Sequence, residues 1–122
     1  MNESSIKRII VDVIRSENGY ARRIEDMFSV GMPDLILIPI RCPCIWAEVK
    51  IIKGQSFGPT ERQLVELERL RRVPYSLGMM LGWKEGVLYS SKPKLKIHIS
   101  ECDEQHKDEK LSDFIRRSSY HV

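Results

Sequence analysis

Two nearly continuous apolar stretches in the first half of the chain constrain its fold more than any other feature. Residues 34–40 are apolar except for Asp34, and residues 44–52 are apolar except for Glu48 and Lys50. A strand with one solvated face alternates apolar and polar residues, whereas a strand covered on both faces is apolar almost throughout. The two stretches therefore predict interior strands of a sheet covered on both faces, the first of them ending near Pro39.

The other segments predict helices and strands that complete such a sheet. Apolar spacing of three and four residues predicts a helix from Ser4 to about residue 17 and a second from Thr60 to Pro74. Strands are expected at 20–28 and 75–83, a β-ribbon at 86–90 with 94–99, and a short helix at 111–117. The inward positions are Ile6, Ile9, Ile10, Val13 and Ile14 in the first helix, Tyr20, Ile24 and Phe28 in the first strand, and Leu64, Leu67 and Leu70 in the second helix. The order α-β-β-β-α-β, then ribbon and helix, predicts an α/β (α+β) fold with a central mixed sheet flanked by helices.

Length and charge favour one small domain with a polyanionic partner. The 122 residues fit a single domain, 1–122, with a core at about 1–100 and a peripheral extension at 101–122. Residues 1–100 carry 16 Lys and Arg against 11 Asp and Glu, whereas 101–122 carry 4 against 6. A basic body suits nucleic acid. Because the sequence contains neither a membrane-length apolar run nor a signal-like start, we expect a cytoplasmic protein without a membrane partner.

The three cysteines leave two interpretations open. Their odd number argues against a disulfide framework and favours reduced thiols. In the second interpretation, Cys42 and Cys44 join His98, Cys102 or His106 as ligands of a structural zinc ion. Such sites normally use more widely spaced cysteine pairs, which favours Cys44 as a small core residue.

Three charged side chains in the two apolar stretches predict the chemistry of the protein. Glu48 and Lys50 lie two residues apart, so in a strand they share one face at a separation of roughly 6.6 Å. Asp34 follows Gly31-Met32-Pro33, and the proline fixes the backbone where the strand begins. Charges in an apolar strand cost several kcal/mol unless they are paired or bound to metal. We therefore expect the two carboxylates to converge on one ion, with Lys50 beside it.

The predicted ion is Mg²⁺ or Mn²⁺. Mg²⁺ takes oxygen ligands and keeps several waters, so one or two carboxylates and a substrate phosphate suffice to hold it. Such an ion polarises a phosphoryl oxygen and lowers the pKa of bound water, while Lys50 would orient that water and offset charge in the transition state. The backbone carbonyl of Val49 is a further candidate ligand.

The combined motif resembles a known nuclease family. Gly31-Met32-Pro33-Asp34, then Trp46-Ala47-Glu48-Val49-Lys50, a glycine loop and Gln63 are similar to the VRR-NUC branch of the PD-(D/E)XK nucleases, in its stand-alone phage or bacterial form. The resemblance covers about residues 1–83. It implies a restriction-endonuclease-like core, metal-dependent cleavage of DNA phosphodiester bonds, branched substrates such as the Holliday junction, and a homodimer.

The resemblance also assigns residues to the site. It implies that Asp34 and Glu48 bind the metal, that Lys50 is catalytic, and that Glu3 on the first helix is another metal ligand. Glu3 is equally explained by the helix dipole, which favours acidic residues in a first turn. Gln63 is implied as a catalytic-site residue, but Thr60-Glu61-Arg62-Gln63 also has the pattern of a capping box.

The DNA contacts are predicted less sharply. Lys53, in the loop after the motif, and Arg62, on the second helix, are candidate phosphate contacts, and Phe57 is a candidate for stacking on a base or wedging a junction. Phe57 is equally suited to pinning its loop to the core. The main hypothesis is a structure-selective, metal-dependent DNA endonuclease, and the alternative is a non-catalytic DNA-binding or dimerisation module that retains the nuclease-like fold.

Overall fold

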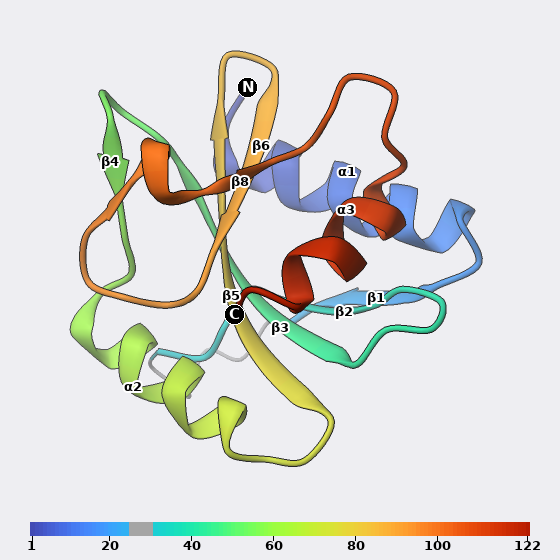
Figure 1. Cartoon of the computed structure of the whole chain (residues 1–122), viewed down its shortest axis with the longest axis horizontal. Coiled ribbons are helices and arrows are strands. Elements are labelled where there is room, and N and C mark those ends of the chain that lie inside the picture. The colour runs from blue at the N-terminus through green and yellow to red at the C-terminus, as the bar shows by residue number, and fades with distance from the viewer. Residues whose placement is uncertain (25–30) are drawn as a thin grey trace.

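A computed structural model describes residues 1–24 and 31–122 and shows a twisted sheet between helices (Figure 1). The helices are α1 (Glu3–Ser16), α2 (Glu61–Arg71) and α3 (Leu111–Ser119), with a 3₁₀ turn at Ile99–Glu101. The strands are β1 (Tyr20–Arg23), β2 (Leu35–Ile38), β3 (Cys44–Ile51), β4 (Ser56–Phe57), β5 (Ser76–Lys84), β6 (Val87–Ser91), β7 (Ile97–His98) and β8 (Asp103–Glu104).

The main sheet is mixed, as the sequence predicted. Its strand order is β1-β2-β3-β5-β6-β8, with β3 and β5 parallel and all other neighbours antiparallel. A parallel pair needs a crossover connection, and the chain between β3 and β5 supplies it with α2. The two apolar stretches become β2 and β3, and each is bonded on both sides. The predicted interior strands are therefore confirmed.

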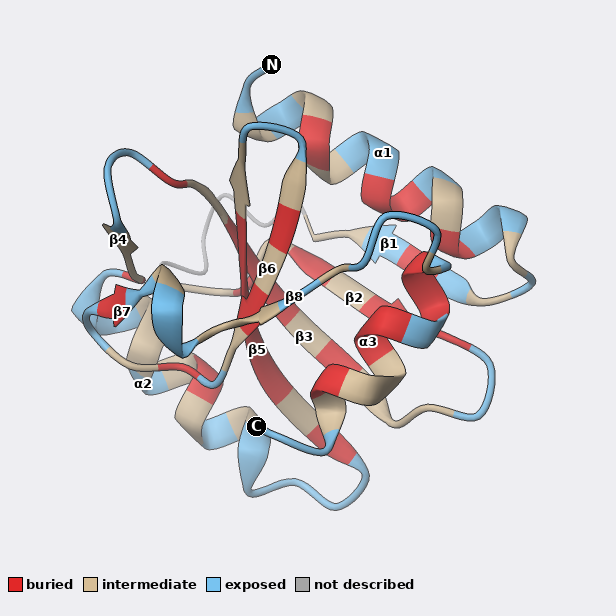
Figure 2. Cartoon of the chain, turned by 45° about the horizontal axis from the view of Figure 1, so that its top comes forward, coloured by how far each residue is buried: buried red, intermediate tan, exposed pale blue. Residues whose placement is uncertain are grey.

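Helices cover both faces of this sheet, because its strands alternate between two cores. Ala47, Val49 and Leu81 pack into the larger core with residues of α1 and α3. Met80, one residue before Leu81, points to the other face, where it packs with Leu67 of α2. Figure 2 shows the buried residues concentrated in β3, β5 and the inner sides of α1 and α3. The described helices are all too short or too polar to cross a membrane.

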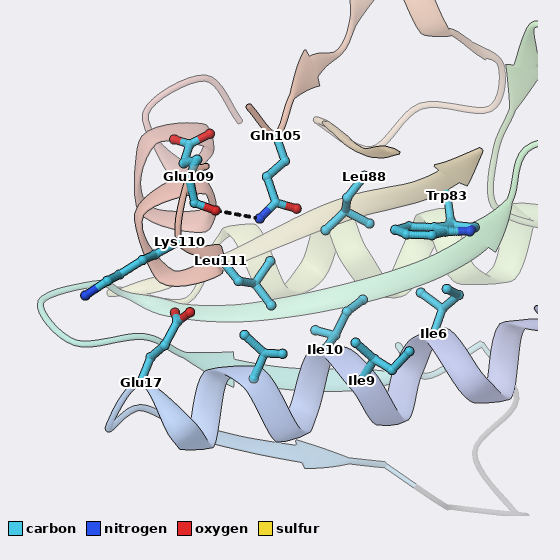
Figure 3. Close-up of a pocket in the computed structure, with 11 residues that line it drawn as sticks. Ile6, Ile9, Ile10, Glu17, Trp83, Leu88, Gln105, Glu109, Lys110 and Leu111 are labelled. Carbon is cyan, nitrogen blue, oxygen red and sulfur yellow. Dashed lines mark hydrogen bonds between the residues drawn. The ribbon is translucent and has the colours of Figure 1, made fainter. Parts of the chain in front are cut away.

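The first helix begins at an Asn cap and buries a narrower stripe than the sequence predicted. The Asn2 side chain accepts a hydrogen bond from the Ser5 amide at 2.8 Å. Ile6, Ile10 and Ile14 are buried, as expected, and Val13 is half-buried. Ile9 is 44% exposed. It lines an apolar pocket of about 220 Å³ between α1 and the β5–β6 hairpin, where Figure 3 shows it near Trp83 and Leu88.

Two local predictions differ from the structure. β1 ends at Arg23, and its Ala21 is buried while Tyr20 is 53% exposed. The inward face of this strand was therefore assigned to the wrong alternation, and its predicted continuation through Phe28 lies outside the described residues. In α2 only Leu67 is fully buried, whereas Leu64 and Leu70 are half-buried.

The predicted ribbon of 86–90 with 94–99 is wrong. β6 pairs with β5 on one side and with β8 on the other, so it has no edge left for a third partner. β7 instead pairs with β4, opposing Ile97 to Phe57. The loop expected at 53–59 thus contains a short strand. Ile97 and Phe57 together cap the small core under α2.

The C-terminal helix is part of the main core instead of a peripheral extension. Its Leu111, Phe114 and Ile115 are buried in the larger core, although much of the preceding acidic segment is exposed. A hydrogen bond of 2.7 Å from the Ser112 amide to Glu17 ties the start of α3 to the end of α1. The apolar face of α3 therefore completes the layer that α1 begins.

Replacing Phe114 tests the structural weight of α3. Phe114→Ala is expected to lower the free energy of unfolding by about 3–5 kcal/mol, because it removes a fully buried ring. Tyr120→Ala, at an 81% exposed position just after the helix, should change it by about 0.5 kcal/mol or less. Urea denaturation of both variants measures the difference. Equal, small effects would contradict the placement of α3 in the core.

Candidate active site

Asp34 lies directly before β2 and replaces a missing backbone partner of β3. The antiparallel register pairs Leu35 with Ala47, and one further step places Asp34 opposite Glu48. β2 does not extend to Asp34. Instead, the Asp34 carboxylate oxygen Oδ2 accepts a hydrogen bond from the Val49 amide at 3.0 Å. Buried backbone donors require such a partner. The end of the ladder thereby fixes one carboxylate beside the other.

Gly31 brings this strand end against the second helix. Its φ of +92° is a left-handed conformation that favours glycine. A Cβ atom at this position would lie 2.9 Å from the Arg62 carbonyl oxygen, closer than a side chain can approach. The Gly31-Met32-Pro33-Asp34 motif therefore places the start of β2 next to the first turn of α2.

Glu48 is a buried carboxyl group with one oxygen lacking a partner. The residue is 1% exposed, although it lies in the middle of a strand. Its Oε1 accepts a hydrogen bond from the Gln63 side-chain amide, and its Oε2 is buried without a hydrogen-bond partner among the described residues. The pKa of Glu48 is raised to about 8, mainly by burial and next by the neighbouring Asp34 carboxylate, while Lys50 and Lys7 act in the opposite direction.

Gln63 completes the capping box that caps α2 and also contacts Glu48. Its Oε1 accepts the Thr60 amide at 2.9 Å, and the Thr60 hydroxyl accepts the Gln63 amide at 3.2 Å, which completes the capping box. The side-chain NH₂ group of Gln63 still points to Glu48. The capping box thus orients the Gln63 side chain, and its amide in turn holds the Glu48 carboxyl group in place.

Two lysines approach the carboxyl pair from different elements. The Lys50 ammonium lies 3.9 Å from Glu48 Oε1, and its side chain is 26% exposed. The Lys7 ammonium lies 3.0 Å from Asp34 Oδ1. Sequence reasoning missed Lys7. The available signal was its position four residues after Glu3, which places both on the same side of α1.

The structure does not bring Glu3 into this group. Among the described residues, no three His, Cys, Asp or Glu side chains lie close enough together to hold a metal ion. Glu3 is in the first turn of α1, where Lys7, one turn later, takes the place beside Asp34. The site assembled here consists of two carboxyl groups, two ammonium groups and one amide.

The zinc interpretation is wrong for the residues that the structure describes. Cys42, Cys44 and Cys102 are free thiols, and they form no ligand cluster with the described histidines. Burial raises the pKa of all three thiols, that of Cys102 to about 11. A thiolate is the form that binds zinc, so these surroundings disfavour it.

The predicted DNA contacts lie on the surface around α2 and the loop before it. Lys53 and Arg62 are exposed. Phe57 is half-buried against Leu67, Met80 and Ile97, so it does pin its loop to the small core. A DNA-contacting role of these three residues stays a prediction.

A comparison with solved structures identifies a protein with a similar fold. The chain matches a solved structure of Hjc from Archaeoglobus fulgidus, a Holliday junction resolvase from an archaeal hyperthermophile, with a TM-score of 0.64. The match has 14% identity and covers 80% of this chain and 88% of that chain. This chain has the fold of that resolvase. The nuclease-like mixed fold predicted from the sequence is therefore confirmed.

Sequence comparisons add no family to this resolvase fold. A comparison with protein-family models finds no match, and a comparison with curated proteins finds none either. The VRR-NUC resemblance therefore stays a prediction that rests on the motif residues.

The raised pKa of Glu48 predicts how stability depends on pH without metal. The folded state binds this proton more tightly than the unfolded state, so the contribution is fully present below pH 4.5 and lost as the pH rises through about 8. The free energy of unfolding of wild type is expected to fall relative to Glu48→Gln over this range. Urea denaturation in EDTA measures the difference, in which other titrating groups largely cancel. A difference independent of pH would contradict the buried position of the carboxyl group.

Proposed function

We propose that this chain is a divalent-metal-dependent endonuclease that hydrolyses phosphodiester bonds of DNA, with branched DNA such as the Holliday junction as substrate. The observation that carries the proposal is the buried Glu48, which faces Asp34 while Lys50 lies beside it at the end of an interior strand pair. The fold that this chain shares with a Holliday junction resolvase is a second support for the proposal.

The residues present fit a hard divalent cation. Glu48 Oε2 is an oxygen donor without a hydrogen-bond partner among the described residues, and Asp34 adds a carboxylate that the Val49 amide holds in place. Oxygen donors suit Mg²⁺ or Mn²⁺. Asp34 and Glu48 would hold the ion, with the Val49 carbonyl as a further proposed ligand. When bound, such an ion supplies polarisation of a phosphoryl oxygen and a lowered pKa of water.

The surrounding side chains would orient and balance charge. Gln63 holds one oxygen of Glu48 and thereby leaves the other directed into the site. Lys50 remains partly exposed, so its ammonium group can reach a phosphate or an attacking water and offset negative charge as the bond breaks. Lys7 neutralises Asp34 in the free protein and keeps it in position.

A homodimer would match the proposed substrate. A junction has two equivalent strands to cut, and two symmetric cuts need two active sites related by a two-fold axis. The alternative, a DNA-binding or dimerisation module without catalysis, shares the fold but would leave Glu48 buried without a task.

Cleavage of a labelled four-way junction tests the proposed activity. Wild type with Mg²⁺ is expected to cut it, and EDTA should abolish the cut. Glu48→Gln should lower the rate by about 100-fold or more, because it removes an anionic ligand worth several kcal/mol in the transition state. Single-stranded, duplex, flap and fork DNA in parallel define the preferred structure.

Glu104→Gln is the matched control for this assay. It removes the same charge from an exposed residue of β8 and should cut at the wild-type rate. Thermal unfolding confirms that both variants are folded. Binding of the junction by wild type without any cleavage in Mg²⁺ or Mn²⁺ would favour the non-catalytic alternative.

A further inference from the structure

A groove rich in arginine lies between α1 and β1. It has a volume of about 650 Å³ and is lined by four arginines, Arg8 and Arg15 from α1 and Arg22 and Arg23 from β1, with Asp12 as the one acidic residue among its lining. We call this feature the arginine groove. The sequence placed these residues on a predicted helix and strand but gave no sign that they would meet.

The groove keeps much of its positive charge available. Among the described residues, the side chains of Arg8 and Arg22 form no ion pair or hydrogen bond, and both residues are exposed. Arg15 is oriented through its Nε, which donates to the Ala21 carbonyl at 2.9 Å. Even with Arg23 left out of the count, Arg8, Arg15 and Arg22 bring three guanidinium groups against the Asp12 carboxylate of the lining, so the groove carries a net positive potential that attracts anions.

The spacing of the arginines suits a chain of phosphates. Arg8 and Arg15 are seven residues apart on one helix, which is about 10.5 Å along its axis. A DNA strand presents one negative charge per roughly 3.4 Å of helix axis, so this distance spans about three phosphates. Guanidinium groups bind phosphate oxygens in a bidentate manner.

The groove lies beside the candidate active site, because its lining residue Ile24 is bonded to the backbone of Asp34. Arg8 follows Lys7, the residue whose ammonium group contacts Asp34. On the strand side, Arg23 donates to Ser4 at 3.3 Å, and the next residue, Ile24, bonds through its amide to the Asp34 carbonyl at 2.8 Å. A backbone bound in the groove would therefore lie close to the Asp34 end of the carboxyl pair.

We propose that the arginine groove binds the phosphodiester backbone of the DNA that the candidate active site cuts. The proposal rests on the proposed function and adds a binding surface to it, on the side of α1 and β1 instead of α2. The groove lies near a site proposed to cut phosphodiester bonds. This proximity favours DNA over an acidic protein segment as its ligand.

Salt-dependent binding of a labelled four-way junction tests the groove. All variants carry Glu48→Gln and are measured in EDTA, so that no cleavage interferes. Adding Arg8→Ala and Arg22→Ala removes two groove cations that have no structural contacts. The magnitude of the slope of log K against log salt is expected to fall by about 2, with binding on the order of tenfold weaker near 0.1 M salt. Arg72→Ala with Lys107→Ala removes two exposed charges outside the groove and should leave the slope unchanged.

The outcomes separate this proposal from the proposed function. An unchanged slope in the groove variant, or an equal change in the control, overturns the groove whether or not wild type cuts DNA. Binding of a poly-glutamate peptide that is lost in the groove variant, with DNA binding intact, also overturns it in favour of a protein partner. A slope reduced as predicted while wild type cuts nothing supports the groove and contradicts only the proposed catalysis.

Discussion

The structure depends on a carboxyl group buried in the interior of a sheet. Glu48 lies in a strand bonded on both sides, with one oxygen tied to Gln63 and the other without a partner. Such a group is costly to bury as an anion, which is why its pKa is raised to about 8. A cation in this place would remove the cost, and the proposed nuclease chemistry follows from that need.

The fold supplies this geometry at the start of β2 and the start of α2. β2 begins at Leu35, opposite Ala47, whereas β3 continues to Ile51, so Asp34 enters the site through its bond to the Val49 amide. α2 starts at the same edge, and its capping box aims Gln63 at Glu48. Gly31 permits the close approach of the two. The ends of secondary-structure elements therefore position the described side chains of the site.

Much of this arrangement could be predicted from local sequence, because apolar runs, turn residues and caps act over a few positions. They located β2, β3 and α2, and they placed Asp34 beside Glu48. Features that depend on distant partners could not be predicted in this way. The pairing of β7 with β4, the burial of α3 and the contact of Lys7 with Asp34 join segments that share no local signal. The arginine groove belongs to the same class, since α1 and β1 form it together.

The claim that Asp34 and Glu48 share a divalent cation is tested most directly by counting bound Mn²⁺. Electron paramagnetic resonance of the free ion, titrated with protein at neutral pH, gives the stoichiometry and affinity. We expect one ion per chain in wild type and loss of that site in Glu48→Gln and in Asp34→Asn, with both variants still folded. Absence of binding by wild type, or undiminished binding by the two variants, would contradict the account.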